Sequence, residues 1–169
     1  MSVAAVVLAA GEATRFGAPK QRLLLPSVLD RLAASPVDEV VVVAGAYALD
    51  APDDVRVVGC PDWARGPGAS LRCGLAALGP EVEAAVVVLA DGPDLSPAAV
   101  GRVVDEWRSR GGIVAASYAG ARGHPLVLGL ADWGDVPDGG LHERPVRLVP
   151  CDDLGAPRDV DRPEDLASA

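Results

Sequence analysis

The sequence of 169 residues is most informative in the residue types that it lacks. It contains no Asn, and its only Lys, Thr, Phe and Gln all lie between positions 14 and 21. Of its 15 Lys and Arg residues, one is Lys20 and all the others are Arg. An ammonium on a flexible stem is a compact point charge that the planar fork of Arg does not replace. The segment around Lys20 is therefore the first candidate for a functional loop.

Long apolar runs and clusters of basic residues are also absent. No apolar run reaches the roughly twenty residues that a membrane-spanning helix needs. Met1 and Ser2 lead directly into the first apolar run, with no basic leader before it. A formal net charge of −9 argues against nucleic-acid binding, which depends on clustered Lys and Arg. We therefore expect a cytoplasmic protein that binds neither a membrane nor a nucleic acid.

Cysteine is scarce as well. Cys60, Cys73 and Cys151 are an odd number, and no two of them have the CxxC spacing of a zinc or redox site. This pattern favours reduced thiols in core or loop positions over disulfides. A chain of this length buries about two-thirds of its unfolded surface, so a core can form without cross-links. We expect a single domain over residues 1–169 that acts as a monomer.

Apolar runs separated by turn residues predict alternating strands and helices. Strands are expected at residues 3–8, 39–44, 55–58, 84–90, 113–117, 123–128 and 146–149, and helices at 27–35, 71–78 and 97–107. Ser27 is a candidate N-cap of the first helix, and Ser96 followed by Pro97 begins the third. Continuous apolar runs are typical of strands buried on both faces of a parallel sheet. The pattern predicts an α/β fold with three layers, in which helices flank a mostly parallel, Rossmann-like sheet.

The first apolar run ends directly in a loop suited to an anionic ligand. Ala9, Ala10 and Gly11 are small enough for a ligand to approach the main chain. Arg15 and Lys20 add two cations within six positions. The loop fits neither the P-loop pattern nor GxGxxG. A phosphate-binding loop is one interpretation, and a solvated, flexible loop with two cations is the other.

Four further positions have both a functional and a structural interpretation. Asp91 follows the most apolar strand, at the carboxyl end where open α/β sheets bind ligands. Ser70 lies near the start of a helix and suits an N-cap. His124 either bonds across a site or anchors its own loop. Asp161 has an acidic residue three positions later, which is the spacing of a capping box.

Four motifs, in order, resemble those of one family. They are Leu8-Ala9-Ala10-Gly11 with Arg15-Phe16-Gly17 and Lys20, the segment 61–74, Leu89-Ala90-Asp91-Gly92-Pro93, and Gly123-His124-Pro125 with residues 158–166. The family patterns are LAAGxSxRMGxxK, NPxxxxGMxxSLxxG, LADxP, and GHP with DIDTPEDL. The sequence therefore resembles the molybdenum-cofactor cytidylyltransferases and guanylyltransferases, most closely the cytidylyltransferases. This resemblance implies a nucleotide-diphospho-sugar-transferase-like fold and a nucleotidyltransferase domain.

The resemblance also implies roles for particular residues in a magnesium-dependent enzyme. The nucleotide-binding residues would be Leu8, Ala9, Ala10, Gly11, Arg15, Lys20, Asp62 and Ser70. Arg15, Lys20 and Asp91 would be catalytic, Asp91 and Asp161 would bind Mg²⁺, and His124 would lie on the acceptor side. His142 lies in an irregular stretch and carries no such signal.

The implied reaction transfers a nucleoside monophosphate from a triphosphate to a phosphorylated acceptor and releases pyrophosphate. Ala10 favours CTP, since relatives that use GTP tend to have a Gly there. The acceptor implied is molybdopterin bearing molybdenum, with a molybdenum hydroxylase or its chaperone as protein partner. Guanylyl transfer and sugar-phosphate nucleotidyl transfer remain alternatives. A non-catalytic nucleotide-binding or regulatory module is another, because the segments after Lys20 and at residues 133–145 are shorter than in the family.

Overall fold

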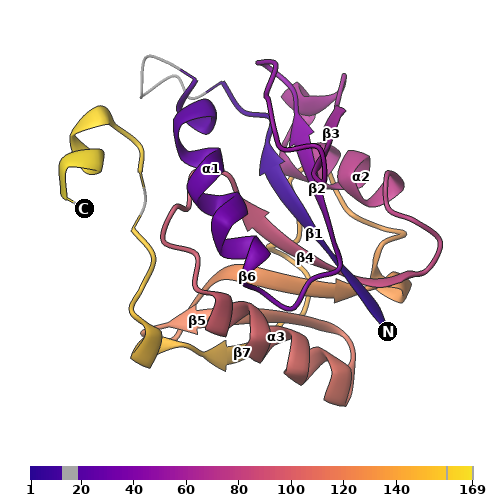
Figure 1. Ribbon diagram of the computed structural model, residues 1–169. Coiled ribbons are helices and arrows are strands. Elements are labelled where there is room, and N and C mark those ends of the chain that lie inside the picture. The colour runs from indigo at the N-terminus through magenta and orange to yellow at the C-terminus, as the bar shows by residue number, and fades with distance from the viewer. Residues whose placement is uncertain (13–18, 159, 169) are drawn as a thin grey trace.

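A single seven-stranded sheet forms the centre of the computed structural model, which describes residues 1–12, 19–158 and 160–168 (Figure 1). The strands are β1 (Ser2–Ala9), β2 (Glu39–Ala44), β3 (Arg56–Gly59), β4 (Val82–Leu89), β5 (Ile113–Tyr118), β6 (Ala121–Gly129) and β7 (Arg147–Pro150). Their order across the sheet is β3-β2-β1-β4-β6-β5-β7. Strand β6 is antiparallel to both neighbours, and all other pairs are parallel. The predicted mostly parallel sheet is confirmed.

The central strands are buried because both faces of the sheet are covered. Val6 of β1 lies in register between Val41 of β2 and Val87 of β4, and all three are at most 3% exposed. Burying a Val side chain contributes about 1.5–3 kcal/mol relative to exposure. The unbroken apolar runs of the sequence therefore stand at the middle of the sheet.

Helices form a layer on each face of the sheet. They are α1 (Lys20–Ala33), α2 (Pro67–Ala76) and α3 (Pro97–Arg110), with short 3-10 helices η1 (Trp63–Arg65), η2 (Leu130–Asp132), η3 (Asp152–Leu154) and η4 (Pro163–Ser168). Helices α1 and α3 pack on one face, and α2 packs on the other with Val136 and Leu141 (Figure 1). The three-layer α/β prediction is confirmed. Within the described residues, no helix is both long enough and apolar enough to cross a membrane.

Two helix starts differ from the prediction. Helix α1 begins at Lys20, with Pro26 inside it, rather than at a cap on Ser27. Its buried stripe already includes Leu24 and Leu25, and this packing outweighs the hydrogen bond that Pro26 removes. Helix α2 begins at Pro67, which is favourable at a first helical position, so Ser70 is a buried interior residue and not an N-cap.

Helix α3 matches its prediction closely. Ser96 accepts a hydrogen bond from the Ala99 amide at 3.3 Å, and the helix begins at Pro97. Trp107 packs over β6, where a Cβ on Gly129 would lie 2.8 Å from the Trp107 Nε1. The local signals and the packing agree here, so the start of α3 was predictable, although the helix continues to Arg110, beyond the predicted end at residue 107.

The expectation of three reduced cysteines is wrong for two of them. Cys60 and Cys73 form a disulfide, with Cα atoms 5.8 Å apart, and only Cys151 is a free, buried thiol. The chain turns back through η1 into α2, which brings the end of β3 beside the first turns of that helix. The two cysteines come together only through the tertiary fold. Their separation of 13 residues, without a CxxC spacing, therefore did not indicate a disulfide.

Candidate functional site

One edge of the sheet gathers the candidate residues. The parallel strands β1 and β4 end there, and Gly11 and Asp91 follow them. Because β6 runs the opposite way, its first residues, including Arg122 and His124, lie at this same edge. Helix α1 also begins at this edge with Lys20. The carboxyl edge of an open α/β sheet is where such folds bind ligands.

Lys20 lies at the meeting point of two acidic residues. Its Nζ is 3.0 Å from Asp91 Oδ2 and 3.4 Å from Asp161 Oδ1, and it donates a hydrogen bond to the Val160 carbonyl at 2.8 Å. The Lys20 side chain is only 9% exposed, whereas those of Asp91 and Asp161 are 36% and 48% exposed. Three residues far apart in the sequence thus form one cluster, whose carboxylates face both the ammonium and solvent.

The two carboxylates suit part of a magnesium site. Mg²⁺ prefers oxygen ligands and usually keeps several waters, with few protein ligands. Within the described part of the chain, no group of three or more His, Cys, Asp or Glu side chains is arranged to hold a metal. Asp91 and Asp161 therefore fit an ion that takes its other ligands from water and a triphosphate.

The predicted capping box does not form. Asp165, rather than Glu164, accepts hydrogen bonds from the backbone amides of Asp161 and Arg162, each at 2.9 Å. These two bonds are the main cause of the lowered pKa of Asp165. The carboxylate of Asp161 instead contacts Lys20, so capping does not account for its presence.

Asp94 has a structural partner of its own. Its carboxylate forms an ion pair with Arg158, whose Nε lies 2.6 Å from Asp94 Oδ2. The Arg158 hydrogen bond lowers the pKa of Asp94. Of the two acidic residues that follow β4, Asp91 is therefore the one directed to the Lys20 cluster.

A cavity of about 290 Å³ opens beside the glycine loop, and we call it the Trp63 cavity. Its lining residues are Leu8, Ala10, Gly11, Trp63, Ala64, Gly66, Pro67, Ser70 and Leu89. It brings together four of the predicted nucleotide-binding residues. Ala9 does not line the cavity and is part of the core, with 3% of its surface exposed. Asp62 is exposed and lines neither this cavity nor the Asp91 or histidine cavity. The predicted residue Arg15 lies outside the described residues.

Trp63 shapes this cavity, and its role depends on Gly45. A Cβ on Gly45 would lie 2.5 Å from Trp63 Cγ and 2.8 Å from the Ala10 Cβ, so only glycine fits between them. The loop itself is held from two sides. Gln21 Nε2 donates to the Gly11 carbonyl at 2.9 Å, and the Ala46 amide donates to the Ala10 carbonyl at 3.0 Å.

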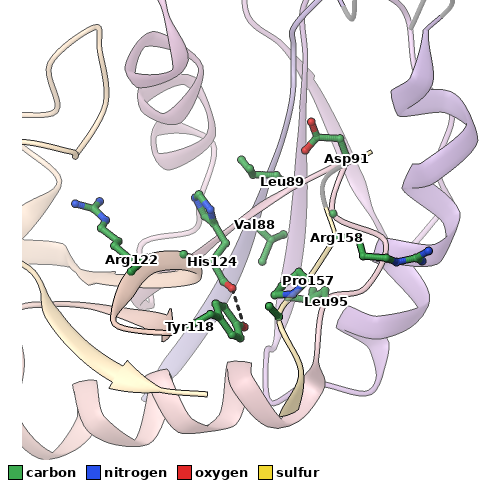
Figure 2. A pocket seen from close by; sticks show the side chains of 13 residues that line it. Val88, Leu89, Asp91, Leu95, Tyr118, Arg122, His124, Pro157 and Arg158 are labelled. Atoms are coloured by element: carbon green, nitrogen blue, oxygen red, sulfur yellow. Dashed lines mark hydrogen bonds between the residues drawn. The ribbon is translucent and has the colours of Figure 1, made fainter. Parts of the chain in front are cut away.

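Two further cavities share Leu89 with the Trp63 cavity. The Asp91 cavity, of about 320 Å³, is drawn in Figure 2 and is lined by Val88, Leu89, Asp91, Gly92, Leu95, Tyr118, Ala121, Arg122, Gly123, His124, Ala156, Pro157 and Arg158. The histidine cavity, of about 440 Å³, is lined by Leu8, Pro67, Leu71, Val87, Leu89, Arg122, Gly123, His124, Leu126, Gly139, Gly140, Leu141 and His142. Arg122 and His124 belong to both linings and separate the two spaces.

His124 is placed by its neighbours as well as by its strand. The Tyr118 hydroxyl donates to the His124 carbonyl at 3.2 Å, the bond that is dashed in Figure 2. Burial raises the pKa of Tyr118, so this hydroxyl stays a donor. His124 thus lines the cavities while its backbone anchors the turn into β6, and its two predicted interpretations are compatible.

Sequence reasoning missed three residues that line these cavities. Trp63 lies within the motif at residues 61–74, and Arg122 directly precedes the Gly123-His124-Pro125 motif. Their positions in or next to these motifs were the only signals in the sequence for a role at the site. His142 had no local signal, because its place in the wall depends on how residues 133–145 fold over α2.

Comparisons with known proteins identify relatives over most of the chain. A family model described as MobA-like NTP transferase domain matches residues 5–139. Two curated 2-C-methyl-D-erythritol 4-phosphate cytidylyltransferases, from Stenotrophomonas maltophilia strains R551-3 and K279a, are 38% and 40% identical over 134 residues. Each match covers 66% of this chain and 56% of the relative, so the chain spans just over half the length of these curated proteins.

Solved structures share the fold over the whole chain. Rv0371c from Mycobacterium tuberculosis H37Rv has a TM-score of 0.82 at 29% identity, covering 99% of this chain and 97% of that one. The same protein in complex with manganese has a TM-score of 0.81 at 29% identity, with the same coverage. A nucleotidyl transferase from Methanothermobacter has a TM-score of 0.73 at 21% identity, covers 99% and 95% of the two chains, and shares the fold. The predicted fold class is confirmed.

Proposed function

The chain belongs to the MobA-like NTP transferase domain family, and from this premise we propose that it transfers a nucleoside monophosphate from CTP to a phosphorylated acceptor. In this reaction an acceptor phosphate oxygen forms a bond to the α-phosphorus. The bond from that phosphorus to the bridging oxygen breaks, and pyrophosphate leaves. The observation that carries the proposal is the contact of Lys20 with Asp91 and Asp161, at the same edge of the sheet as the Gly11 loop.

The residues of this cluster would position the triphosphate. The Gly11 loop would provide amide donors, and Lys20 with Arg15 would neutralise phosphate oxygens, a form of electrostatic stabilisation that acts where negative charge develops. Asp91 and Asp161 would hold Mg²⁺, which when bound would supply further positive charge to those oxygens. A relative's crystal structure in complex with manganese supports a divalent ion.

Charge balance in the cluster supports an exchange of partners on binding. The Lys20 ammonium now pairs with both carboxylates, and its one positive charge offsets only part of their negative charge. A triphosphate would draw the ammonium to its own oxygens, while a divalent cation would take over the carboxylates. No covalent nucleophile is needed, because positioning and charge supply the catalysis.

Two features support CTP as the donor nucleotide. The Ala10 methyl group narrows the Trp63 cavity, where a nucleobase would lie. The curated relatives that the chain matches are cytidylyltransferases by name. Pocket shape alone discriminates by roughly 1–3 kcal/mol, so we expect a preference over GTP of about ten- to a few-hundredfold.

Two acceptors are proposed, and both are phosphomonoesters. The motif resemblance favours molybdopterin bearing molybdenum, with a molybdenum hydroxylase or its chaperone as recipient. The names of the curated relatives favour 2-C-methyl-D-erythritol 4-phosphate. We further propose that residues 1–169 act as one domain and as a monomer.

Pyrophosphate release with Mg²⁺ tests the proposal directly. Each of CTP and GTP is combined with each acceptor, and release is expected with CTP and one of the two phosphomonoesters. Ala10→Gly should reduce the preference for CTP over GTP without loss of total turnover. Calorimetric binding of CTP without any pyrophosphate release, with both acceptors supplied, would instead favour a non-catalytic nucleotide-binding module.

A further inference from the structure

The histidine cavity differs in charge from the rest of the molecule. The chain has 24 Asp and Glu residues and only two His, yet both His124 and His142 line this one cavity. Arg122 lines it too, and no carboxylate is among its lining residues. A protein of net charge −9 has thus placed three basic side chains around one cavity without acidic neighbours in its wall.

Arg122 is an arginine without a carboxylate partner among the described residues. Arg65, Arg72 and Arg158, which lie near the same edge, each pair with an Asp. The guanidinium of Arg122 instead donates from Nη1 to the Leu141 carbonyl at 2.9 Å, which leaves its other N–H groups for a ligand. Partial burial desolvates the Arg122 guanidinium and lowers its pKa, although the residue as a whole is exposed.

His142 is held in a defined position. Its Nδ1 lies 3.0 Å from the Gly139 carbonyl oxygen, which can only accept, so Nδ1 carries the hydrogen. The remaining ring nitrogen, Nε2, is left for a ligand. His124 lies in the same cavity wall as Arg122, two positions later in β6. Figure 2 shows both side chains extending from this strand.

The wall that carries His142 is fixed to helix α2. The Gly68 amide donates to the Asp138 carbonyl at 2.8 Å, and Arg65 and Arg72 both pair with the Asp138 carboxylate. A Cβ on Gly68 would lie 1.6 Å from the Pro137 carbonyl oxygen, so the helix and the segment touch through backbone. The shortened segment at residues 133–145 therefore still builds a firm cavity wall.

The rest of the cavity is apolar. Its remaining side chains are mainly Leu8, Leu71, Val87, Leu89, Leu126 and Leu141. A volume of about 440 Å³ lies in the usual range for small-molecule sites, which combine apolar walls with a few placed polar groups. Such a cavity suits a ligand with an apolar face and one anionic group.

We propose that the histidine cavity binds the phosphate of the acceptor through Arg122, His124 and His142, and that the acceptor is a phosphomonoester whose body has an apolar face. The assignment to the acceptor rests on the proposed function. The cavity shares Leu8, Pro67 and Leu89 with the Trp63 cavity, and Arg122 and His124 with the Asp91 cavity. A phosphate at Arg122 and His124 thus lies at the boundary of the space that contains Asp91.

Histidine side-chain NMR tests this site without turnover, because the chain has only two imidazoles and both line the cavity. The protein is titrated without nucleotide or metal, using phenyl phosphate as a phosphomonoester with an apolar body, inorganic phosphate, and CTP as separate probes. We expect both imidazole signals to shift with phenyl phosphate, which should bind more tightly than inorganic phosphate because its ring enters the apolar part.

The decisive variant is Arg122→Gln. It should weaken phenyl phosphate by about ten- to a hundredfold, the effect of losing one charged hydrogen-bonding partner, and leave CTP affinity unchanged. Arg122→Lys should restore part of the affinity, which a merely misfolded variant would not do. Arg147→Gln is the matched control, since Arg147 also donates to a carbonyl, that of Gly111, but lines none of these cavities. It should leave both titrations unchanged.

Failure of this site and failure of the proposed function give different results. Shifts of neither imidazole with phenyl phosphate, or equal affinity in Arg122→Gln, would overturn the site even if pyrophosphate release occurs. Weaker CTP binding in Arg122→Gln would assign the anion site to the triphosphate and would also overturn it. Arg122-dependent phenyl phosphate binding in a protein that releases no pyrophosphate would keep the site and reject only the transferase reaction.

Discussion

The proposed nucleotide side and the proposed acceptor side of the site, which we call the nucleotide side and the acceptor side, differ in how their charges are balanced. On the nucleotide side, the Lys20 ammonium is already neutralised by Asp91 and Asp161. On the acceptor side, the guanidinium of Arg122 has no carboxylate partner among the described residues and only a carbonyl to bond. A ligand that binds Lys20 must replace the existing ion pairs of Lys20 with Asp91 and Asp161. An anion that binds Arg122 breaks no ion pair with a carboxylate.

This difference suits two substrates of different charge. A triphosphate arrives with a divalent cation, so the first side needs both a cation and carboxylates. A phosphomonoester arrives alone, so carboxylates near it would repel it. The predictions below probe the nucleotide side of this comparison, and the Arg122 variants probe the other.

The largest effect is expected at the two carboxylates. Asp91→Asn and Asp161→Asn should each lower turnover by roughly three orders of magnitude, because each removes charge that would hold the metal. The double variant should be little worse than either single one, since groups that act as one unit are non-additive. Pyrophosphate release at limiting Mg²⁺ measures this, with circular dichroism to check folding.

A different outcome would separate the two carboxylates. If Asp161 had only a structural role, its side chain would provide the contact with Lys20, and Asn keeps an oxygen for that contact, so the change to Asn would be tolerated. Wild-type turnover in Asp161→Asn would leave Asp91 as the only carboxylate proposed to bind the metal. It would also contradict the view that both carboxylates are needed on the nucleotide side.

A slightly smaller loss is expected at Lys20. Lys20→Ala should lower turnover by about two to three orders of magnitude, the range for one preorganised charge at developing negative oxygens. Lys20→Arg should recover little of it, because the side chain is 9% exposed and the planar fork does not fit the same contacts. The readout is kcat with saturating CTP. Full activity in Lys20→Arg would mean that any cation serves.

The smallest effect should come from Gly45→Ala. The added Cβ would lie 2.5 Å from Trp63 Cγ, so Trp63 must move and the Trp63 cavity must change shape. Overpacking of this kind lowers the free energy of unfolding by about 1–3 kcal/mol. Because the displaced Trp63 would also change the cavity wall, we expect KM for CTP to rise by about tenfold, equivalent to about 1.4 kcal/mol of binding, with little change in kcat. Gly101→Ala is a matched control, because a Cβ there meets no atom within 4 Å. An unchanged KM would show that the nucleotide does not use this wall.

The sequence indicated the residues that gather around Lys20 far better than the residues that line the histidine cavity. The strand-to-loop junctions at Gly11 and Asp91 are local patterns, since an unbroken apolar run followed by small or acidic residues specifies both the strand and its carboxyl end. Lys20 was indicated by composition, because it is the only Lys in the sequence. The contact of Lys20 with Asp161 follows from topology, because both lie at the same edge of the sheet.

The acceptor side depends on tertiary packing that no local pattern reveals. His142 reaches the cavity only because residues 137–140 pack against the start of α2. Arg122 bonds to the Leu141 carbonyl and pairs with no carboxylate among the described residues, which depends on how the chain around Leu141 packs. The Cys60–Cys73 pair and the true start of α1 were missed for the same reason, because packing decided both.

Because β6 runs antiparallel to its neighbours, the proposed nucleotide side and acceptor side are carried by separate chain segments, which can be mutated independently. The nucleotide side is built on loops that follow β1 and β4, whereas Arg122 and His124 stand at the beginning of β6, after a turn at Ala119 and Gly120. Lengthening or replacing that turn would alter the acceptor wall while the chain segments that carry Gly11, Lys20 and Asp91 keep their connections. An engineer seeking a new acceptor for this fold would therefore begin at the turn between β5 and β6.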